Sequence, residues 1–510
     1  MTPSTEDGAG VRPVKQASPL EMSTEEMRAL GRHVTDLLVR RLETLATSAP
    51  WKGAPRSELE PVLREDPPEE GRPAREVVDR AVREILPVAG RVDHPRFFAF
   101  VPSSPTWPGI LADYLSAGFN IFQGTWLGSS GPSQAELVVV DWFRKWLGYP
   151  ETAGGLFTSG GSAASLDALV AAREAAGAPA GPTVYMSDQS HTALVRAARI
   201  VGVPGENIRM VPSDDAFRLR MDALKEAVEA DRQRGFTPIA VCANAGATNT
   251  GAVDPLEEMA GFCAREGIWL HVDAAYGGFA MVTEAGRHLL RGMERADSVT
   301  LDAHKWLFQP FEAGCLMVKD VRRLESAFSV RPEYLQDTEL GMEHVNFADR
   351  GLQLTRSFRA LKVWMSIQTF GMAAFRSSVA LGIELAERAA AFVKASSVLE
   401  LLSPPSLGVA CFRYRPRDTT LDEEALERVN AGIQARIIGD ETAMMSSTRL
   451  RGTYALRLCI LNHRSTWTDV EDTLRTIERV GAEEVAGNGG RTAADGPEAG
   501  KAGAGPARQS

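Results

Sequence analysis

The sequence IWLHVDAAYGG occupies residues 268–278, where an apolar run ends in a carboxylate and small residues follow. A short apolar run of this kind is typical of a buried strand. In an open parallel sheet, ligands bind beyond the carboxyl ends of the strands. The pattern therefore predicts that Asp273 lies where a ligand binds. An aspartate that only caps a loop at the end of a strand is the alternative interpretation.

A second strand-like run, DSVTLDAHKW at residues 297–306, ends in His304 and Lys305. A lysine that ends a buried strand is uncommon, because its charge must be paired or its pKa must fall. Such a lysine is suited to forming an imine with a carbonyl compound. The alternative is an ordinary lysine that reaches solvent.

A third segment, TSGGSAAS at residues 158–165, opens a helical stretch at 162–176. Small residues at the start of a helix expose backbone N–H groups and the positive end of the helix dipole, which suits a phosphate group. A serine nucleophile at Ser162 is the alternative, but the order GGSAA has alanine where the G-x-S-x-G pattern has its last glycine.

The surrounding sequence alternates between strands and helices. Strand-like runs at 183–186, 239–243 and 268–272 alternate with helical stretches at 162–176 and 256–266. This alternation predicts a parallel sheet covered by helices, which is an α/β domain.

The last part of the chain has a different pattern. Strand-like runs at 409–414 and 454–461 are each followed by a capping-box motif. The two motifs pair Thr420 with Glu423 and Thr468 with Glu471. We interpret this part as a small, separate α+β domain.

The N-terminal part predicts an amphipathic helix. The sequence STEE at 23–26 is a capping box, and apolar residues follow it at helical spacing up to Leu45. We expect the apolar stripe to pack on the body or on a second subunit. The expected organisation is a disordered tail (1–19), an N-terminal helical dimerisation segment (20–93), a large domain (94–385), a small domain (386–485) and a second disordered tail (486–510).

Composition limits the classes of function. A chain of 510 residues predicts two or three domains, and a formal net charge of -10 argues against a nucleic-acid partner. We expect no membrane partner, because no apolar run reaches the ~20 residues that span a bilayer. The first 19 residues show no secretory leader, and the five scattered cysteines lack a C-x-x-C pair. We expect free thiols, no metal site and a cytoplasmic enzyme.

The three segments together meet the needs of one cofactor. An amine that forms an imine, a carboxylate for a ring nitrogen and a phosphate-binding helix start are what pyridoxal phosphate requires. The carboxylate keeps the pyridine nitrogen protonated, so that the ring accepts electrons from the bond that breaks.

At this point the sequence resembles the group II pyridoxal-phosphate-dependent decarboxylases, and among them the aromatic-L-amino-acid decarboxylases, over residues 20–480. The resemblance rests on the segments already quoted and on three more, which read HPRFFA at 94–99, SDQSH at 187–191 and RSFRALK at 356–362. It implies a fold type I enzyme, similar to aspartate aminotransferase, with a large parallel-rich sheet domain and a small α+β C-terminal domain. It also implies a homodimer with the active site at its interface.

The resemblance implies roles for individual residues. Lys305 corresponds to the lysine that holds the cofactor as a Schiff base, and Asp273 to the partner of the pyridine nitrogen. The remaining cofactor residues implied are His191 stacked on the ring, Ala275 against its other face, Gly161 and Ser162 at the phosphate, Thr248 beside the cofactor and His304 next to the lysine. Asp302 departs from the family, whose members often have asparagine there. A carboxylate at that position would repel the phosphate unless it were protonated or turned away, so Asp302 is not assigned to the site.

The segment RPEYLQ at 331–336 resembles the family's catalytic loop. In that loop a tyrosine protonates the carbon after carbon dioxide leaves, and Tyr334 fits this place, although a surface tyrosine is the alternative. Because Tyr334 and His191 are both present, the resemblance favours simple decarboxylation through a quinonoid intermediate over an oxidative reaction that yields an aldehyde.

The resemblance also implies which residues surround the substrate side chain, and these are Phe100, Val101, Pro102 and Phe122. This apolar set predicts an aromatic amino acid as substrate, with a large aliphatic one as the alternative. Gly124 lies where many relatives have a bulky residue. The motifs also fit an aldehyde synthase with the same cofactor, or a non-catalytic homologue that binds the cofactor as a partner subunit. A hydrolase that uses Ser162 is a more distant interpretation.

Overall fold

The computed structural model describes residues 18, 20–330 and 344–488. They form two compact units. The first runs from the N-terminus to Ser48 and from Lys52 to Ala89, and the second, the body, contains Ala49–Trp51 and the chain from Gly90 onward.

The first unit is helical. Its α-helices are α1 (Thr24–Glu43), α2 (Arg56–Leu63) and α3 (Ala74–Arg80). The expected capping box is present, because Ser23 accepts a hydrogen bond from the backbone of Glu26 and the Glu26 side chain accepts one from the backbone of Ser23. No residue of α1 is buried, and its apolar side chains are half-buried or, as at Met27, Val34 and Val39, exposed within this chain.

A seven-stranded sheet organises the body, in the order β1-β7-β6-β5-β4-β2-β3. The strands are β1 (Gly154–Thr158), β2 (Pro182–Ser187), β3 (Ile208–Val211), β4 (Thr237–Asn244), β5 (Trp269–Asp273), β6 (Ser298–Asp302) and β7 (Gly314–Val318). The pairings from β6 across to β3 are parallel, and β7 is antiparallel to both β6 and β1. All strands except β7 therefore run in one direction, which confirms the expected parallel-rich α/β sheet.

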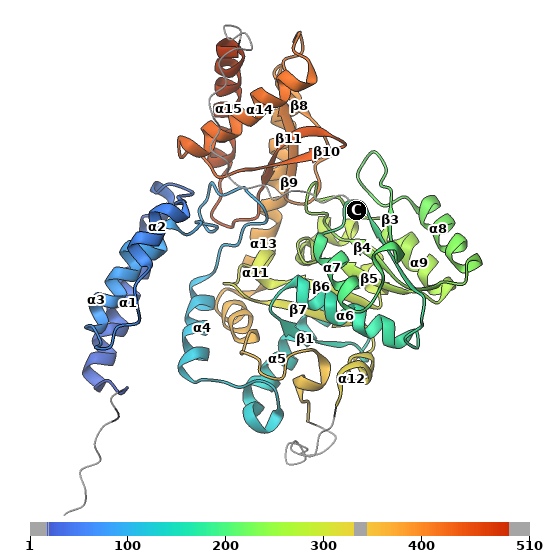
Figure 1. Cartoon of the computed structure of the whole chain (residues 1–510), viewed down its shortest axis with the longest axis horizontal. Coiled ribbons are helices and arrows are strands. Elements are labelled where there is room, and N and C mark those ends of the chain that lie inside the picture. Colours follow the sequence, from blue (N-terminus) through green and yellow to red (C-terminus); the bar gives the residue numbers. More distant parts are fainter. Residues whose placement is uncertain (1–17, 19, 331–343, 489–510) are drawn as a thin grey trace, which may run out of the picture. The chain divides into compact units, whose positions relative to one another are not determined.

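Helices pack on this sheet (Figure 1), among them α5 (Trp126–Leu147), α6 (Gly161–Ala175), α8 (Met221–Gln233) and α9 (Leu256–Glu266). Because helices cover both faces, the central strands are buried along most of their length, and Val241, Val272 and Val299 have no exposed surface. Because the strands are fixed along their whole length, the residues at their carboxyl ends are held in place.

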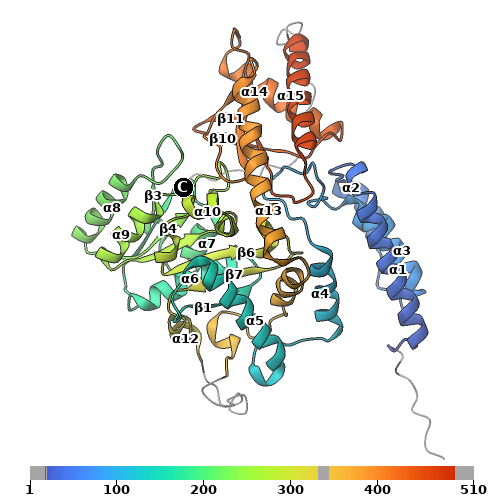
Figure 2. The same ribbon diagram turned by 180° about the vertical axis from the view of Figure 1, so that it is seen from behind.

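A second, four-stranded antiparallel sheet has the order β10-β11-β9-β8. It consists of β8 (Leu399–Leu401), β9 (Val409–Tyr414), β10 (Ser446–Leu450) and β11 (Thr453–Cys459). It packs with α14 (Glu423–Gly439) and α15 (Trp467–Asn488), and α13 (Ala360–Ala395) runs between the two sheets (Figures 1 and 2). α15 continues past residue 485, where we expected the ordered chain to end.

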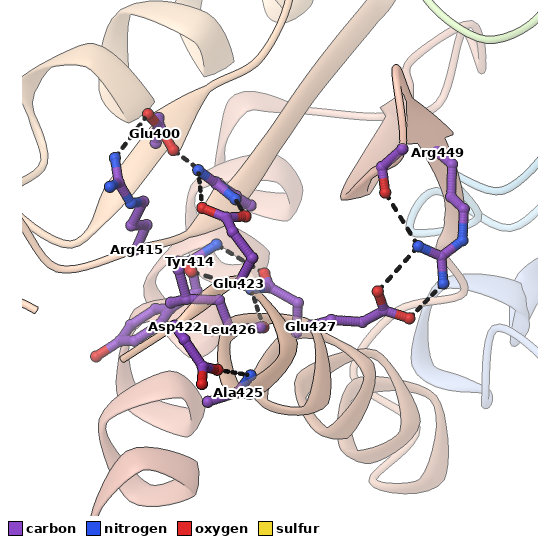
Figure 3. Close-up of polar contacts among 12 residues, drawn as sticks. Glu400, Tyr414, Arg415, Asp422, Glu423, Ala425, Leu426, Glu427 and Arg449 are labelled. Atoms are coloured by element: carbon purple, nitrogen blue, oxygen red, sulfur yellow. Dashed lines mark hydrogen bonds and ion pairs between the residues drawn. The ribbon is translucent and has the colours of Figure 1, made fainter. Parts of the chain in front are cut away.

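The capping boxes expected for α14 and α15 are wrong by two residues. Asp422 caps α14, because its side chain accepts a hydrogen bond of 2.8 Å from Ala425 N (Figure 3). Glu423 instead forms an ion pair with Arg413 of β9. This use of its carboxylate explains why the expected motif with Thr420 does not form.

At α15, the reciprocal bonds join Thr466 and Asp469. Asp469 N donates to Thr466 Oγ1 at 3.3 Å, and Thr466 N donates to Asp469 Oδ2 at 2.9 Å. Glu471, expected to act in the capping box, pairs with Arg475 one turn further along. Both helices therefore begin at the residues whose short side chains reach the free N–H groups.

All five cysteines are buried free thiols, as expected. Within the described ranges, no helix is long and apolar enough to cross a membrane.

Candidate active site

One edge of the large sheet collects the chemically informative residues. Asn244 ends β4, Asp273 ends β5 and Asp302 ends β6, and these three strands are parallel. β1 runs in the same direction, so α6 begins at this edge with Gly161. A pocket of about 620 Å³ lies among these residues.

The pocket contains ten of the residues expected from the sequence. They are Phe100, Val101, Gly161, Ser162, His191, Thr248, Asp273, Ala275, His304 and Lys305. They come from segments far apart in the chain, and the sheet brings them together because its strands end side by side.

Lys305 lies on the single turn of α11 (Ala303–Trp306), immediately after β6. Its Nζ is 2.9 Å from Oδ2 of Asp302, and its side chain is 24% exposed. Burial lowers the pKa of Lys305, but attraction to Asp302 and Asp273 and the hydrogen bond to Asp302 outweigh this effect, so the pKa is raised above its usual value. The amine is therefore within reach of the pocket but held as an ammonium group.

Asp273 presents a carboxylate at the end of β5. Its Oδ1 accepts a hydrogen bond of 3.2 Å from Ala275 N. Burial raises the pKa of Asp273, and the positive charge of Lys305 acts in the opposite direction. A cationic N–H group placed in the pocket would stabilise the ionised form of this carboxylate.

The start of α6 has the features of an anion site. Gly160 precedes the helix with φ of 152°, and it provides no side chain to cap the first N–H groups. At Gly161, a Cβ atom would lie 3.0 Å from Cβ of Ala275 and 3.1 Å from Oδ2 of Asp302. A larger residue at Gly161 would thus crowd the space in front of the helix, where backbone N–H groups can bind a phosphate.

Two histidines have one ring nitrogen already engaged. Nδ1 of His191 accepts from Ala193 N at 3.2 Å, and Nδ1 of His304 accepts from Ala313 N at 3.1 Å. A neutral ring with Nδ1 as acceptor carries its proton on Nε2. Burial is the main cause that lowers the pKa of His304, so this ring is neutral near pH 7.

These groups fit pyridoxal phosphate. Lys305 offers the amine, Asp273 the carboxylate for the ring nitrogen and the start of α6 the N–H groups for the phosphate. The glycine at 161 keeps the front of that helix open.

Two of the expected residues that the structure describes, Pro102 and Phe122, do not line the pocket. Pro102 is buried but does not line it. The ring of Phe122 lies against Gly124 and Gly128, where added Cβ atoms would meet it at 2.6 and 3.0 Å. Tyr334 lies outside the described residues.

The pocket also contains residues that the sequence interpretation did not assign. They are Ser159, Gly160, Ala163, Ala193, Asn244, Gly246, Tyr276, Asp302, Phe311 and Glu312. Asn244 could have been found by the rule that selected Asp273, because it directly follows the strand expected at 239–243. Phe311 and Glu312 precede the antiparallel strand β7, and no local pattern indicated that this strand begins at the same edge.

Comparison with known proteins shows the family of the chain. The family model described as "Pyridoxal-dependent decarboxylase conserved domain" matches residues 56–415. An aromatic-L-amino-acid decarboxylase of Bacillus atrophaeus is 39% identical over 469 residues, which cover 91% of this chain and 97% of the relative. A phenylacetaldehyde synthase of Petunia hybrida is 31% identical over 466 residues, with 86% and 91% covered.

Solved structures agree as well. The structure of Oryza sativa TDC with PLP and tryptamine superposes with a TM-score of 0.86 at 28% identity, covering 92% of this chain and 99% of that one. This similarity and the geometry of the pocket confirm the expected fold type I architecture. The match to the family model covers more than half of the chain, so the chain belongs to the pyridoxal-dependent decarboxylase family and uses pyridoxal phosphate as its cofactor.

Proposed function

We propose that this decarboxylase acts on an L-amino acid with an aromatic side chain and releases the corresponding amine and carbon dioxide. The observation that carries the proposal is the convergence of Lys305, Asp273 and the start of α6 on one pocket. The aromatic specificity is supported by the similarity to the aromatic-L-amino-acid decarboxylase of Bacillus atrophaeus.

When bound, pyridoxal phosphate supplies an aldehyde for an amine and a ring that accepts the electrons of the broken bond. In our proposal, Lys305 holds the cofactor covalently, and Asp273 keeps a proton on the ring nitrogen. The N–H groups at Gly161 and Ser162 bind the phosphate, and Thr248, Ala275 and His304 line the cofactor. His191 would contact the cofactor ring, and Tyr334 would donate the proton that replaces the carboxyl group.

Part of the lining of the pocket is apolar. Phe100, Val101 and Phe311 line it. The carboxylate of Glu312 is paired with Arg359 at 2.7 Å, so it is not an unpaired negative charge that would select a basic substrate. These features support an aromatic side chain, with a large aliphatic one as the alternative.

Phe100 supports the same proposal through its backbone. It has a φ of 53°, which is rare for a bulky residue, and its side chain is 63% exposed at the pocket. Its N–H donates to Ser446 Oγ and its carbonyl accepts from Arg457. A strained conformation held by such contacts is typical of a functional site.

An aldehyde synthase is the second candidate, because relatives with that name are also similar to the chain. We favour decarboxylation alone because His191, one of the two residues for which the resemblance favours simple decarboxylation, lines the pocket. The two reactions differ in their products, since the oxidative one releases hydrogen peroxide and ammonia.

We also propose that the chain acts as a cytoplasmic homodimer, with 20–93 as a dimerisation segment, 94–385 as the large domain and 386–485 as the small one. Exposed apolar side chains on and after α4 (Trp107–Gly118) support a partner surface. Tyr114, Leu115 and Phe119 are examples. Buried free thiols fit a reducing compartment. Light scattering of the purified enzyme tests the dimer, and cell fractionation tests the compartment.

The decisive experiment combines a visible spectrum with a substrate panel. We expect an absorbance band that borohydride removes, with the reduced cofactor mapped to the Lys305 peptide. Carbon dioxide release is then measured with tryptophan, tyrosine, phenylalanine, dihydroxyphenylalanine and leucine. Release only with leucine would overturn the aromatic specificity, and stoichiometric hydrogen peroxide would establish the oxidative alternative.

A further inference from the structure

The carboxylate of Asp302 has an unusual environment. It is 2% exposed, and its Oδ2 contacts Lys305 Nζ at 2.9 Å. Its Oδ1 is buried and has no hydrogen-bond partner among the described residues. Burying a carboxylate with one unpaired oxygen destabilises the fold, and the charge of Lys305 offsets this effect, while Nε2 of His304 lies 3.6 Å from the same Oδ2.

The carboxylate also lies against the anion-binding end of α6. A Cβ atom on Gly161 would approach Oδ2 of Asp302 to 3.1 Å. A carboxylate at this point opposes the binding of a phosphate, so its presence needs a compensating role. The ion pair with Lys305 provides one.

We propose that Asp302 is a positioning residue that keeps the free amine of Lys305 protonated and directed into the pocket, and so controls how readily this amine reacts with an aldehyde. The proposal rests on the proposed function of Lys305 as the residue that holds the cofactor. An ammonium group has no lone pair for addition to a carbonyl carbon, so the amine reacts only after it loses its proton.

Other titratable groups also face this amine. They are Asp273 at the end of β5, His304 on α11 and Cys459 on β11, while His191 faces Asp273. Among the carboxylates of the described residues, only Asp302 is within ion-pair distance of Lys305 Nζ. Replacing Asp302 with the isosteric, uncharged asparagine therefore removes the direct partner and leaves the others in place.

The size of the effect follows from electrostatics. An opposite charge in direct contact shifts a pKa by about one to three units. Without it, more of the Lys305 amine is unprotonated at a given pH below its pKa. We expect Asp302→Asn to increase the reaction rate of Lys305 with an aldehyde at pH 7.5 by roughly 10-fold or more.

The test uses the full-length chain freed of cofactor, with pyridoxal as the probe, because pyridoxal lacks the phosphate that Asp302 would repel. The amine adds to the aldehyde with loss of water, and borohydride delivers hydride to the carbon–nitrogen double bond, which leaves a stable secondary amine. The label on the Lys305 peptide is quantified by mass spectrometry against time at pH 6 to 10.

Two controls separate this effect from a structural one. Lys145 also pairs with an aspartate, Asp141 at 2.7 Å, and is 62% exposed, so its labelling profile is an internal reference that must not change. Asp297→Asn removes another carboxylate near β6, one that accepts a hydrogen bond from Leu270 N. This variant must leave the Lys305 profile as in the wild type.

The expected result is a Lys305 profile displaced to lower pH in Asp302→Asn, with the Lys145 profile unchanged. An unchanged or oppositely displaced Lys305 profile, or no label on Lys305 at any pH, overturns the proposal. If the asparagine variant does not fold, Asp302→Ser is measured with the same criteria. The labelling does not depend on decarboxylation, so the two claims are tested separately. If the Lys305 profile is displaced in Asp302→Asn but the wild-type enzyme releases no carbon dioxide, the proposed function is refuted and this inference stands.

Discussion

Arg356 and Glu136 form an ion pair in which neither side chain has any exposed surface. Removing one partner is therefore expected to lower the free energy of unfolding by a predictable amount. Nη2 of Arg356 lies 2.6 Å from Oε1 of Glu136 and also donates to the carbonyl of Phe157 at 2.8 Å. Nη1 donates to the carbonyl of Gln123 at 3.0 Å. The pair thus joins α5, β1 and the chain before α13 just behind the loop that leads to Gly161.

Arg356→Met replaces the guanidinium with an apolar side chain of similar length and leaves the carboxylate of Glu136 buried without its counter-ion. Removing one partner of a buried pair costs about 3–5 kcal/mol of unfolding free energy. Arg350 offers a matched control, because it is also buried but its partner Glu325 is 43% exposed. Water can solvate Glu325 after Arg350→Met, so we expect a cost of only about 1 kcal/mol.

The assay is urea unfolding, followed by fluorescence at fixed protein and cofactor concentrations, because ligand and subunit binding both shift apparent stability. Adding Glu136→Gln to Arg356→Met removes the uncompensated charge and is expected to recover part of the lost stability. Equal costs for the two single variants, or no recovery in the double variant, would refute the argument that burial of the unpaired carboxylate sets the cost.

Three further predictions concern the site and the pH dependence of stability. Lys305→Ala is expected to abolish the borohydride-fixed cofactor and to lower kcat at least about 100-fold, as measured by peptide mapping and carbon dioxide release. Asp273→Asn is expected to lower kcat by about 100-fold or more while the visible band of the bound cofactor persists, since only electrostatic stabilisation of the ring is lost. Burial raises the pKa of Asp167 to about 7, so the folded chain keeps a proton that the unfolded chain releases above about pH 4. Stability from this group therefore falls as the pH rises from 4 to 7, and Asp167→Asn is expected to be more stable than the wild type at pH 8, by up to about 4 kcal/mol, but not at pH 4. Melting temperatures at the two pH values check this, and an equal difference at both would contradict it.

Helices and strands of both domains were predictable because their patterns are local. The helix expected at 256–266 is α9, and the strand expected at 409–414 is β9. Burial on both faces makes a strand continuously apolar, and amphipathic helices repeat their apolar residues every three to four positions. The capping residues of α14 and α15 were not predictable in the same way. Several threonines and acidic residues stand near each start, and tertiary ion pairs such as Arg413 with Glu423 decide which of them caps the helix.

The sequence by itself determined the class of the fold and predicted the chemistry that we propose for the site. An aspartate and a lysine that end strand-like runs, and glycines that open a helix, indicated Asp273, Lys305 and Gly161 without any structure. This was possible because a strand end and a helix start are properties of a few consecutive residues.

Only the tertiary structure decided which of these groups meet. It places β7 between β1 and β6, which brings Phe311 and Glu312 to the pocket. It pairs Lys305 with Asp302 and joins Arg356 to Glu136, 220 residues earlier in the chain. Such contacts depend on how the whole chain buries its apolar surface and pairs its buried charges, and no pattern of neighbouring residues encodes that arrangement.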